Sequence, residues 1–217
     1  MPYTAPYPEP YDQLLGNLPL VLMEHDAPEY FGILLQGGFD MPVPEPCTLR
    51  EFLCELVGVC GVYTEKSLQT IFLDGKAIDD LDRALLGPSS RLALSAAMPG
   101  LVGATMRRGG YYSRMREGIS QAKGDGLEAS EKKPFRLHVR LYNAVGRELA
   151  GLFLHHGIFV SSESLLRFLK IQPPKFFDHL QKASLAGAPL PIGSSAAGTW
   201  QLPGGDIALR VTSERKE

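Results

Sequence analysis

Arginines and tyrosines gather in one short stretch near the middle of this 217-residue chain. Guanidinium groups bind phosphates and carboxylates, and tyrosine rings can stack on the bases of a single strand. No further spacing rule accompanies the cluster, so three interpretations stay open: a solvated connector, then a strip for an acidic protein partner, then a nucleic-acid contact. The candidate partner-binding strip consists of Arg107, Arg108, Tyr111, Tyr112, Arg114 and Arg116.

Two adjacent histidines, His155 and His156, suggest a metal site. Neighbouring residues of a strand point to opposite faces, so this pair would need help from His138, His179 or a carboxylate to hold one ion. The ligand spacing typical of zinc is absent. An acidic run has no EF-hand order and is interpreted as a solvated turn; it comprises Asp74, Asp79, Asp80 and Asp82. We assign no metal ligand.

The three cysteines, Cys47, Cys54 and Cys60, are odd in number and lack C-x-x-C spacing. A cysteine nucleophile would need a nearby base, and His25 at the domain edge is the closest histidine in the sequence. We therefore interpret them as reduced, packed thiols. P-loop, Rossmann, G-x-S-x-G and H-E-x-x-H patterns are absent as well. The sequence predicts no catalytic residue and no cofactor-binding residue.

A formal net charge of −2 provides no overall positive field for nucleic acid or an anionic membrane. The N-terminus does not resemble a signal peptide, and no stretch approaches the roughly 18 apolar residues that a membrane span needs. We expect a cytoplasmic protein without a cofactor. A protein partner is expected, membrane and nucleic acid are not, and a homo-oligomer is compatible with the sequence.

Composition divides the chain into four parts: an arm over 1–27, a first domain over 28–104, a basic connector and flexible linker over 105–133, and a second domain over 134–217. Five prolines in the first 20 residues favour a loose arm over a strap packed by Tyr3, Tyr7 and Tyr11. Leu18–Met23 is apolar enough for a short strand or strap. The Gly, Ser and charged residues of 118–133 are typical of a linker.

The first domain begins with a predicted β-hairpin: strand Phe31–Gln36, a Gly37-Gly38 turn, and return strand Phe39–Val43. Thr48 and Glu51 form a capping-box pattern. Helical spacing of the apolar residues that follow predicts an amphipathic helix as far as Val57.

Two more strands follow, Leu68–Leu73 and Arg91–Ser95, the first closed by a tight Asp74-Gly75 turn. One helix laid across a mixed sheet buries both apolar surfaces, and about 70 residues suffice for such a core. The predicted fold class is therefore α+β, with an N-terminal β-grasp domain and a second small α+β domain.

Three sequence segments of the first domain resemble those of the MoaD/ThiS sulfur carriers, which are ubiquitin-like β-grasp proteins. The similar stretches are Thr48–Leu53, Phe72–Asp80 and Leu86–Leu94, within roughly residues 30–103. Sulfur carriers act through a C-terminal Gly-Gly whose carboxylate is adenylated. Here the candidate carrier tail is Gly100, or Gly109 with Gly110, inside a chain that continues for over 100 residues. The resemblance thus implies carrier activity only after cleavage at an internal glycine.

The second half opens with strict alternation over Phe135–Asn143, in which Arg136, His138, Arg140 and Tyr142 share the face opposite the apolar residues. Ala144–Gly146 reads as a turn, and 148–160 as one or two strands. Ser161 or Ser162 caps a helix, Pro173-Pro174 opens another, and Thr199–Val211 forms a closing hairpin. A second β-grasp-like unit and an unrelated α+β domain fit equally. Four strands flanking one principal helix, in the spatial order of the first unit, would support duplication.

Three functions follow. The first is a non-catalytic binding or adaptor protein that uses a β-grasp surface. The second is a sulfur-carrier or modifier-type protein activated by cleavage. The third is an enzyme or accessory subunit with its site between the two halves, where the loop 187–198 could cradle a ligand. A deep pocket lined by His138, His155 or His156 would favour the third.

Overall fold

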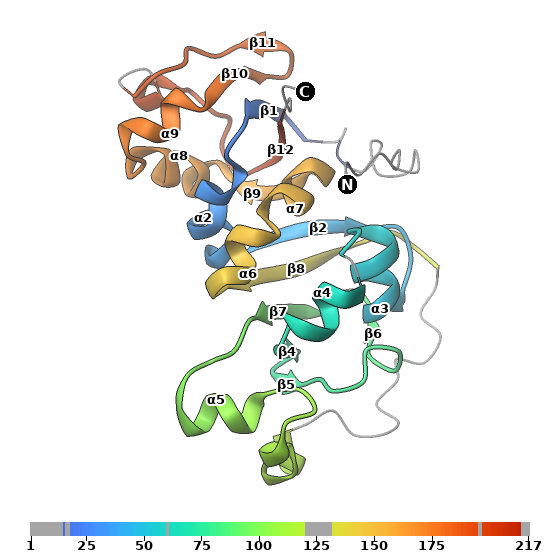
Figure 1. Ribbon diagram of the computed structural model, residues 1–217. Coiled ribbons are helices and arrows are strands. Elements are labelled where there is room, and N and C mark those ends of the chain that lie inside the picture. Colours follow the sequence, from blue (N-terminus) through green and yellow to red (C-terminus); the bar gives the residue numbers. More distant parts are fainter. Residues whose placement is uncertain (1–14, 16–17, 60, 120–131, 195–196, 214–217) are drawn as a thin grey trace.

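The computed structural model describes residue 15 and residues 18–59, 61–119, 132–194 and 197–213. Tyr3, Tyr7, Tyr11, Cys60 and most of the expected linker lie outside this part. One mixed ten-stranded sheet runs through the described residues, which establishes the α+β class (Figure 1). Its spatial order is β11 (Ala188–Pro189), β10 (Leu180–Leu185), β1 (Leu20–His25), β12 (Asp206–Thr212), β9 (Ile158–Ser161), β2 (Phe39–Val43), β8 (Phe135–Tyr142), β7 (Arg91–Ser95), β4 (Thr70–Leu73) and β5 (Lys76–Ala77).

The sheet contains one pairing pattern twice. In the β2 half, formed by β2, β8, β7, β4 and β5, the successive pairings are antiparallel, parallel, antiparallel and antiparallel. In the β9 half, formed by β9, β12, β1, β10 and β11, the pairings follow the same sequence of directions. The halves join where β2 and β9 run antiparallel, with Asp40 opposite Phe159.

Each half also contains one principal helix at the same place in this pattern. In the β2 half, α3 (Leu49–Glu51) continues as the π-type turn η2 (Phe52–Leu56) and separates β2 from β4 along the chain. In the β9 half, α8 (Ser162–Lys170) separates β9 from β10. Shorter elements complete the halves: α4 (Gly61–Lys66), α9 (Pro174–Asp178), η4 (Ala197–Thr199) and the small ladder of β3 (Cys47–Thr48) with β6 (Leu85–Leu86).

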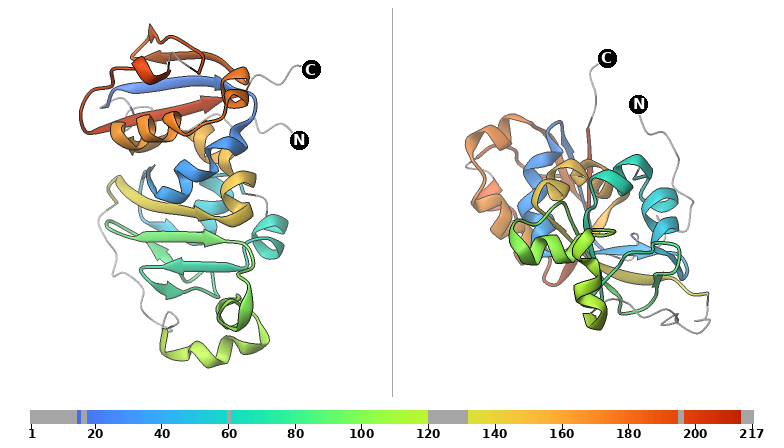
Figure 2. Two further views of the ribbon diagram at one scale, coloured as in Figure 1. Left: turned by 90° about the vertical axis from the view of Figure 1, so that its left-hand side faces the viewer. Right: turned by 60° about the horizontal axis from the view of Figure 1, so that its bottom comes forward.

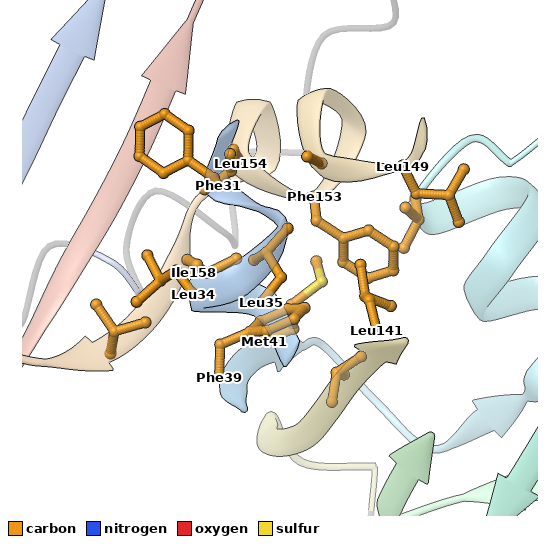
Figure 3. Close-up of a cluster of buried hydrophobic side chains, with 14 of the residues drawn as sticks. Phe31, Leu34, Leu35, Phe39, Met41, Leu141, Leu149, Phe153, Leu154 and Ile158 are labelled. Carbon is orange, nitrogen blue, oxygen red and sulfur yellow. The ribbon is translucent and has the colours of Figure 1, made fainter. Parts of the chain in front are cut away.

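Four short helices pack where the two halves meet. They are η1 (Pro28–Phe31), α2 (Gly32–Gly37), α6 (Asn143–Glu148) and α7 (Ala150–His156). Figure 3 shows Phe153 of α7 projecting toward Leu35, Met41 and Leu141. Its ring lies 5.5 Å from that of Phe39, centroid to centroid. These side chains belong to one apolar cluster that includes residues of both halves.

The chain leaves the sheet after β7 and forms α5 (Gly100–Met106) and η3 (Tyr111–Ile119). This α5–η3 projection lies at the end of the molecule farthest from the β9 half (Figures 1 and 2). It contains the candidate strip and all three candidate tail glycines.

Several local predictions are confirmed. Thr48 Oγ1 accepts from Glu51 N at 3.2 Å, while Thr48 N donates to the Glu51 carboxylate at 2.7 Å, which completes the capping box. Asp74 and Gly75 both have positive φ, as a two-residue hairpin turn between β4 and β5 requires. Ser161 caps α8, Pro174 begins α9, and Leu20–His25 forms a strand.

The predicted first hairpin is wrong. Phe31, Leu34 and Leu35 are buried while Ile33 and Gln36 are exposed, which is helical rather than alternating spacing. The segment therefore forms η1 and α2, and Gly38, with φ of +106°, follows the helix instead of turning a hairpin. Its place beside β2 is taken by β8.

Two predictions in the second half are also wrong. The predicted turn at 144–146 and most of the predicted strand region 148–160 are helical, because Leu149, Ala150, Phe153 and Leu154 form one buried stripe. The region does contain the start of one strand, Ile158–Ser161. Thr199 ends the 3-10 turn η4 and Trp200 forms no strand; its indole N–H donates to the Pro191 carbonyl at 2.8 Å. Strand β12 pairs with β1 and β9 in place of a closing hairpin.

The predicted boundary at 105–133 does not coincide with a break in the sheet. Strand β8, which follows it, lies between β2 and β7, which precede it. Strand β1, from the predicted arm, lies between β10 and β12. Each half of the sheet is thus completed by a strand from the other part of the chain.

Candidate binding site

The outer face of β4, β7 and β8, opposite the buried core, has polar and aromatic side chains. Alternation places Leu137, Val139 and Leu141 in the core and turns His138, Arg140 and Tyr142 outward, as predicted. In the parallel β7–β8 pair, Arg91 is opposite His138 and Ala93 is opposite Arg140. Neighbouring residues on one sheet face lie within side-chain reach. The register therefore brings together basic side chains that are far apart in sequence.

A cavity of about 730 Å³ lies on this face. Its floor is formed by the outward residues of the three strands, and its wall by the segment from Met98 to Gly103 at the start of α5. The close approach of this segment to itself requires glycine at position 103, because a Cβ there would lie 1.9 Å from the Met98 carbonyl oxygen. The lining includes Phe72, Arg91, Ala93, Ser95, Met98, Pro99, Val102, His138, Arg140, Tyr142 and Asn143.

The charge facing the cavity is positive. His138 Nδ1 lies 2.8 Å from an Asp40 carboxylate oxygen, and both side chains are about one-third exposed. In the described part of the chain, no carboxylate forms an ion pair with the Arg91 or Arg140 guanidinium. The Asp74 carboxylate at the rim accepts from the Arg91 backbone N–H at 2.7 Å. Two cationic groups are thus available to a ligand.

A neutral polar pair lies beside these cations. The Asn143 side-chain amide donates to the buried Ser95 hydroxyl at 3.0 Å. Asn143 begins α6 with φ of +56°, a conformation that non-glycine residues seldom adopt. Such outliers cluster at binding sites, where the surrounding structure supports the strain.

Some residues of the candidate strip are buried and hydrogen-bonded within the protein, and others are exposed. The side chain of Arg116 is 1% exposed; it pairs with Asp79 at 2.6 Å and donates to the Thr105 carbonyl at 2.8 Å. Arg108 donates to the Thr64 carbonyl at 2.7 Å, and burial lowers the pKa of its guanidinium. Arg107, Tyr111 and Tyr112 are exposed, and they line a second cavity of about 490 Å³. The Arg114 side chain lies outside the described residues.

The candidate tail glycines occupy turns of the projection. Gly100 begins α5 with φ of +80°, and Gly109 adopts φ of +61° between α5 and η3. Gly109 N–H donates to Asp79, and Gly110 N–H donates to the Arg107 carbonyl. These contacts explain the conformation of Gly109 and Gly110 by local structure, and cleavage at an internal glycine, Gly100 or Gly110, stays the alternative hypothesis.

Other candidate groups have structural contacts. His156 is buried with Nε2 3.0 Å from the Val57 carbonyl, and burial lowers the pKa of its imidazole to about 3. His155, next to it on α7, is exposed. Burial raises the pKa of the Cys47 thiol to about 12. Within the part of the chain that is described, no group of three or more potential ligands is arranged to hold a metal ion.

The predicted acidic turn is used for anchoring. Asp79 holds Arg116, Asp80 pairs with Arg83, and Asp82 pairs with Arg50. Among the described helices, none combines the length and apolar character needed to cross a bilayer.

Comparison with known proteins finds no matching family model, no matching curated protein and no matching solved structure.

Sequence reasoning found His138, Arg140 and Tyr142 as an outward face but missed Arg91, Ser95 and Asn143. The alternation of Arg91–Ser95 would have placed Arg91, Ala93 and Ser95 on one face. Only the pairing of β7 with β8 shows that this face adjoins the other.

Proposed function

We propose that this chain is a non-catalytic adaptor protein with a duplicated β-grasp-like sheet, and that a protein partner docks on its α5–η3 projection. Support for the β-grasp arrangement comes from each half, where one helix follows a strand and the mixed sheet has a parallel pair at its centre. The repeated order of strand directions in the two halves supports a duplicated sheet in which each half includes one strand from the other part of the chain.

Exposed apolar side chains on the projection support docking there. Of the nine large apolar side chains exposed in the described part of the chain, five lie in this segment, with Tyr111 91% exposed, Met115 74% and Leu101 70%. The other two are Val102 and Tyr112. Concentrations of exposed apolar surface commonly mark interaction sites.

The projection is also held in place. The ion pair between buried Arg116 and exposed Asp79 connects η3 to the loop after β5, and Arg108 connects the preceding turn to α4. A surface fixed before binding loses less conformational entropy when a partner docks. Exposed Arg107 beside these apolar groups favours a partner segment with both apolar and acidic side chains.

A photo-crosslinking experiment tests this function. Benzoylphenylalanine would replace Tyr111 in the full chain, expressed in its native host, and Ile171, 60% exposed on the β9 half, would be the matched control position. We expect a discrete protein adduct from position 111 alone. Excess wild-type chain should compete with it, and the Leu101→Ser/Tyr111→Ser double variant should not. Equal adducts from both positions, or none from 111, would contradict the proposal.

The His138-lined cavity favours a second candidate, an enzyme or accessory subunit. A histidine oriented by a carboxylate, as His138 is by Asp40, is the arrangement that general bases commonly use. The adaptor function is preferred because, among the described residues, no serine, cysteine or threonine is hydrogen-bonded to His138.

A further inference from the structure

The two halves of the sheet differ in how their outer faces are covered. In the β9 half, Leu15 and Leu18 pack with Leu20, Phe159 and Ala208 in a small second apolar cluster. In the β2 half the same face retains the cavity of about 730 Å³. In the β9 half a smaller cavity of about 320 Å³ remains over β1 and β10, so the larger cavity, in the β2 half, is the one that its own chain leaves more open.

The floor of the larger cavity, in the β2 half, carries positive charge that is available to a ligand. None of the described residues that line the cavity is acidic, whereas three have basic side chains: Arg91, His138 and Arg140. Asp40 pairs with His138 from beside the cavity, and Asp74 reaches only the Arg91 backbone. Guanidinium groups present paired N–H donors that match carboxylate and phosphate oxygens.

The rest of the lining is apolar and includes aromatic rings. Phe72 and Ala93 are opposite each other in the β4–β7 register and form one part of the floor, with Tyr142 farther along β8. Met98 and Val102 supply the wall. Cavities of a few hundred to about 1,000 Å³ with this mixture commonly receive small organic molecules.

We propose that this cavity binds a small organic anion, a carboxylate or phosphate ester attached to a flat apolar body. The anionic group lies between Arg91 and Arg140, and the apolar body lies between Phe72 and the Met98–Val102 wall. This site adjoins the proposed partner surface, with Val102 common to both, but anion binding does not depend on partner docking.

Calorimetric titration of the full chain with three matched probes tests the site: 1-naphthyl phosphate, 1-naphthoate and neutral 1-naphthamide. At least one anion should bind tenfold more tightly than the amide. Arg91→Gln and Arg140→Gln should each lower the affinity for that anion at least fivefold and change the affinity for the amide less than twofold. Ala93→Trp, which fills the floor, should abolish binding of all three.

Arg136→Gln is the matched control. Arg136 shares the strand and face of Arg140, but it pairs with Asp206 at 3.0 Å and covers the Phe159 ring at 4.3 Å, outside the cavity. Circular dichroism would verify that each variant is folded. Three outcomes overturn the proposal: no binding of either anion at millimolar concentration, equal binding of amide and anions, or equal losses in Arg136→Gln and Arg140→Gln. Tyr111→Ser/Met115→Ser, which changes two exposed residues of η3 outside the cavity lining, should bind the anion normally whether or not the partner proposal holds.

Discussion

The imidazole of His138 on β8 is oriented by the carboxylate of Asp40 on the adjacent strand β2, with Nδ1 and Oδ1 2.8 Å apart. The two residues are direct partners in the antiparallel register, although they are 98 positions apart in sequence. A carboxylate can only accept a hydrogen bond, so this contact places a proton on Nδ1 and directs Nε2 away from Asp40.

Asp40→Leu should remove this tautomer preference. The ring ¹⁵N shifts of His138 at pH 8 should indicate the Nδ1–H tautomer in the wild type and mostly the Nε2–H tautomer in the variant. Both side chains are partly exposed, so the free energy of unfolding should change by less than about 1 kcal/mol. A wild-type spectrum dominated by Nε2–H would contradict the assigned contact.

Gly38→Ala should damage both stability and the binding site. Gly38 has φ of +106°, and a Cβ there would lie 2.9 Å from the His138 ring and 3.2 Å from the Arg140 guanidinium. We expect a loss of about 1–2 kcal/mol in the free energy of unfolding, from the backbone conformation. Binding of the naphthyl anion should also weaken severalfold.

The matched control is Gly205→Ala, because Gly205 has φ of +90° with open space around a Cβ. It should lose similar stability in chemical denaturation and bind the anion as the wild type does. Equal anion binding by both alanine variants would show that Gly38 has no role in positioning His138 and Arg140.

Arg116→Gln should loosen the α5–η3 projection. The change removes the ion pair of the buried Arg116 guanidinium with the exposed Asp79 carboxylate, together with a carbonyl contact. We expect this loss to cost about 2 kcal/mol locally. Hydrogen exchange should accelerate over residues 100–116 and change little in β2 and β9. The exposed Arg107→Gln should leave exchange unchanged; a uniform increase over the whole chain in Arg116→Gln would contradict a local role.

Thr48→Ala should destabilise the principal helix of the β2 half. The cap satisfies the Glu51 N–H, and its loss typically costs about 1 kcal/mol. Thr48→Ser, which keeps the hydroxyl, should recover most of the loss in urea denaturation. No difference between the two variants would show that the hydroxyl has no capping role.

His156 should make the fold acid-sensitive. Burial lowers the pKa of its imidazole from 6.5 to about 3, with Arg210 adding to the effect. Between these values the unfolded chain binds the additional proton, so stability is full above pH 6.5 and falls as pH decreases toward 3, by at most about 1.4 kcal/mol per pH unit.

His156→Gln should flatten this dependence in urea titrations repeated from pH 7 to pH 4. Part of the slope should remain, because burial also lowers the pKa of the His25 imidazole. The exposed His155→Gln is the control and should keep the wild-type slope. An unchanged slope in His156→Gln would contradict the buried neutral imidazole.

The sequence by itself determined the local elements of this protein. The capping box at Thr48, the Asp74-Gly75 turn and the alternation of Phe135–Tyr142 each depend on residues within a few positions of one another. Backbone conformation and the facing of successive side chains follow directly from such spacing. The outward placement of His138 and Arg140 could therefore be predicted.

Only the tertiary structure decided which strands are neighbours. Nothing near Arg91 indicates that it lies opposite His138, because strand pairing depends on the burial of whole apolar faces across the chain. The same burial decided the helical state of Phe31–Gln36, a short apolar run that local periodicity leaves ambiguous. The cavity exists because β8 inserts between β2 and β7. This insertion buries the apolar face of β8 in the core that the two halves share.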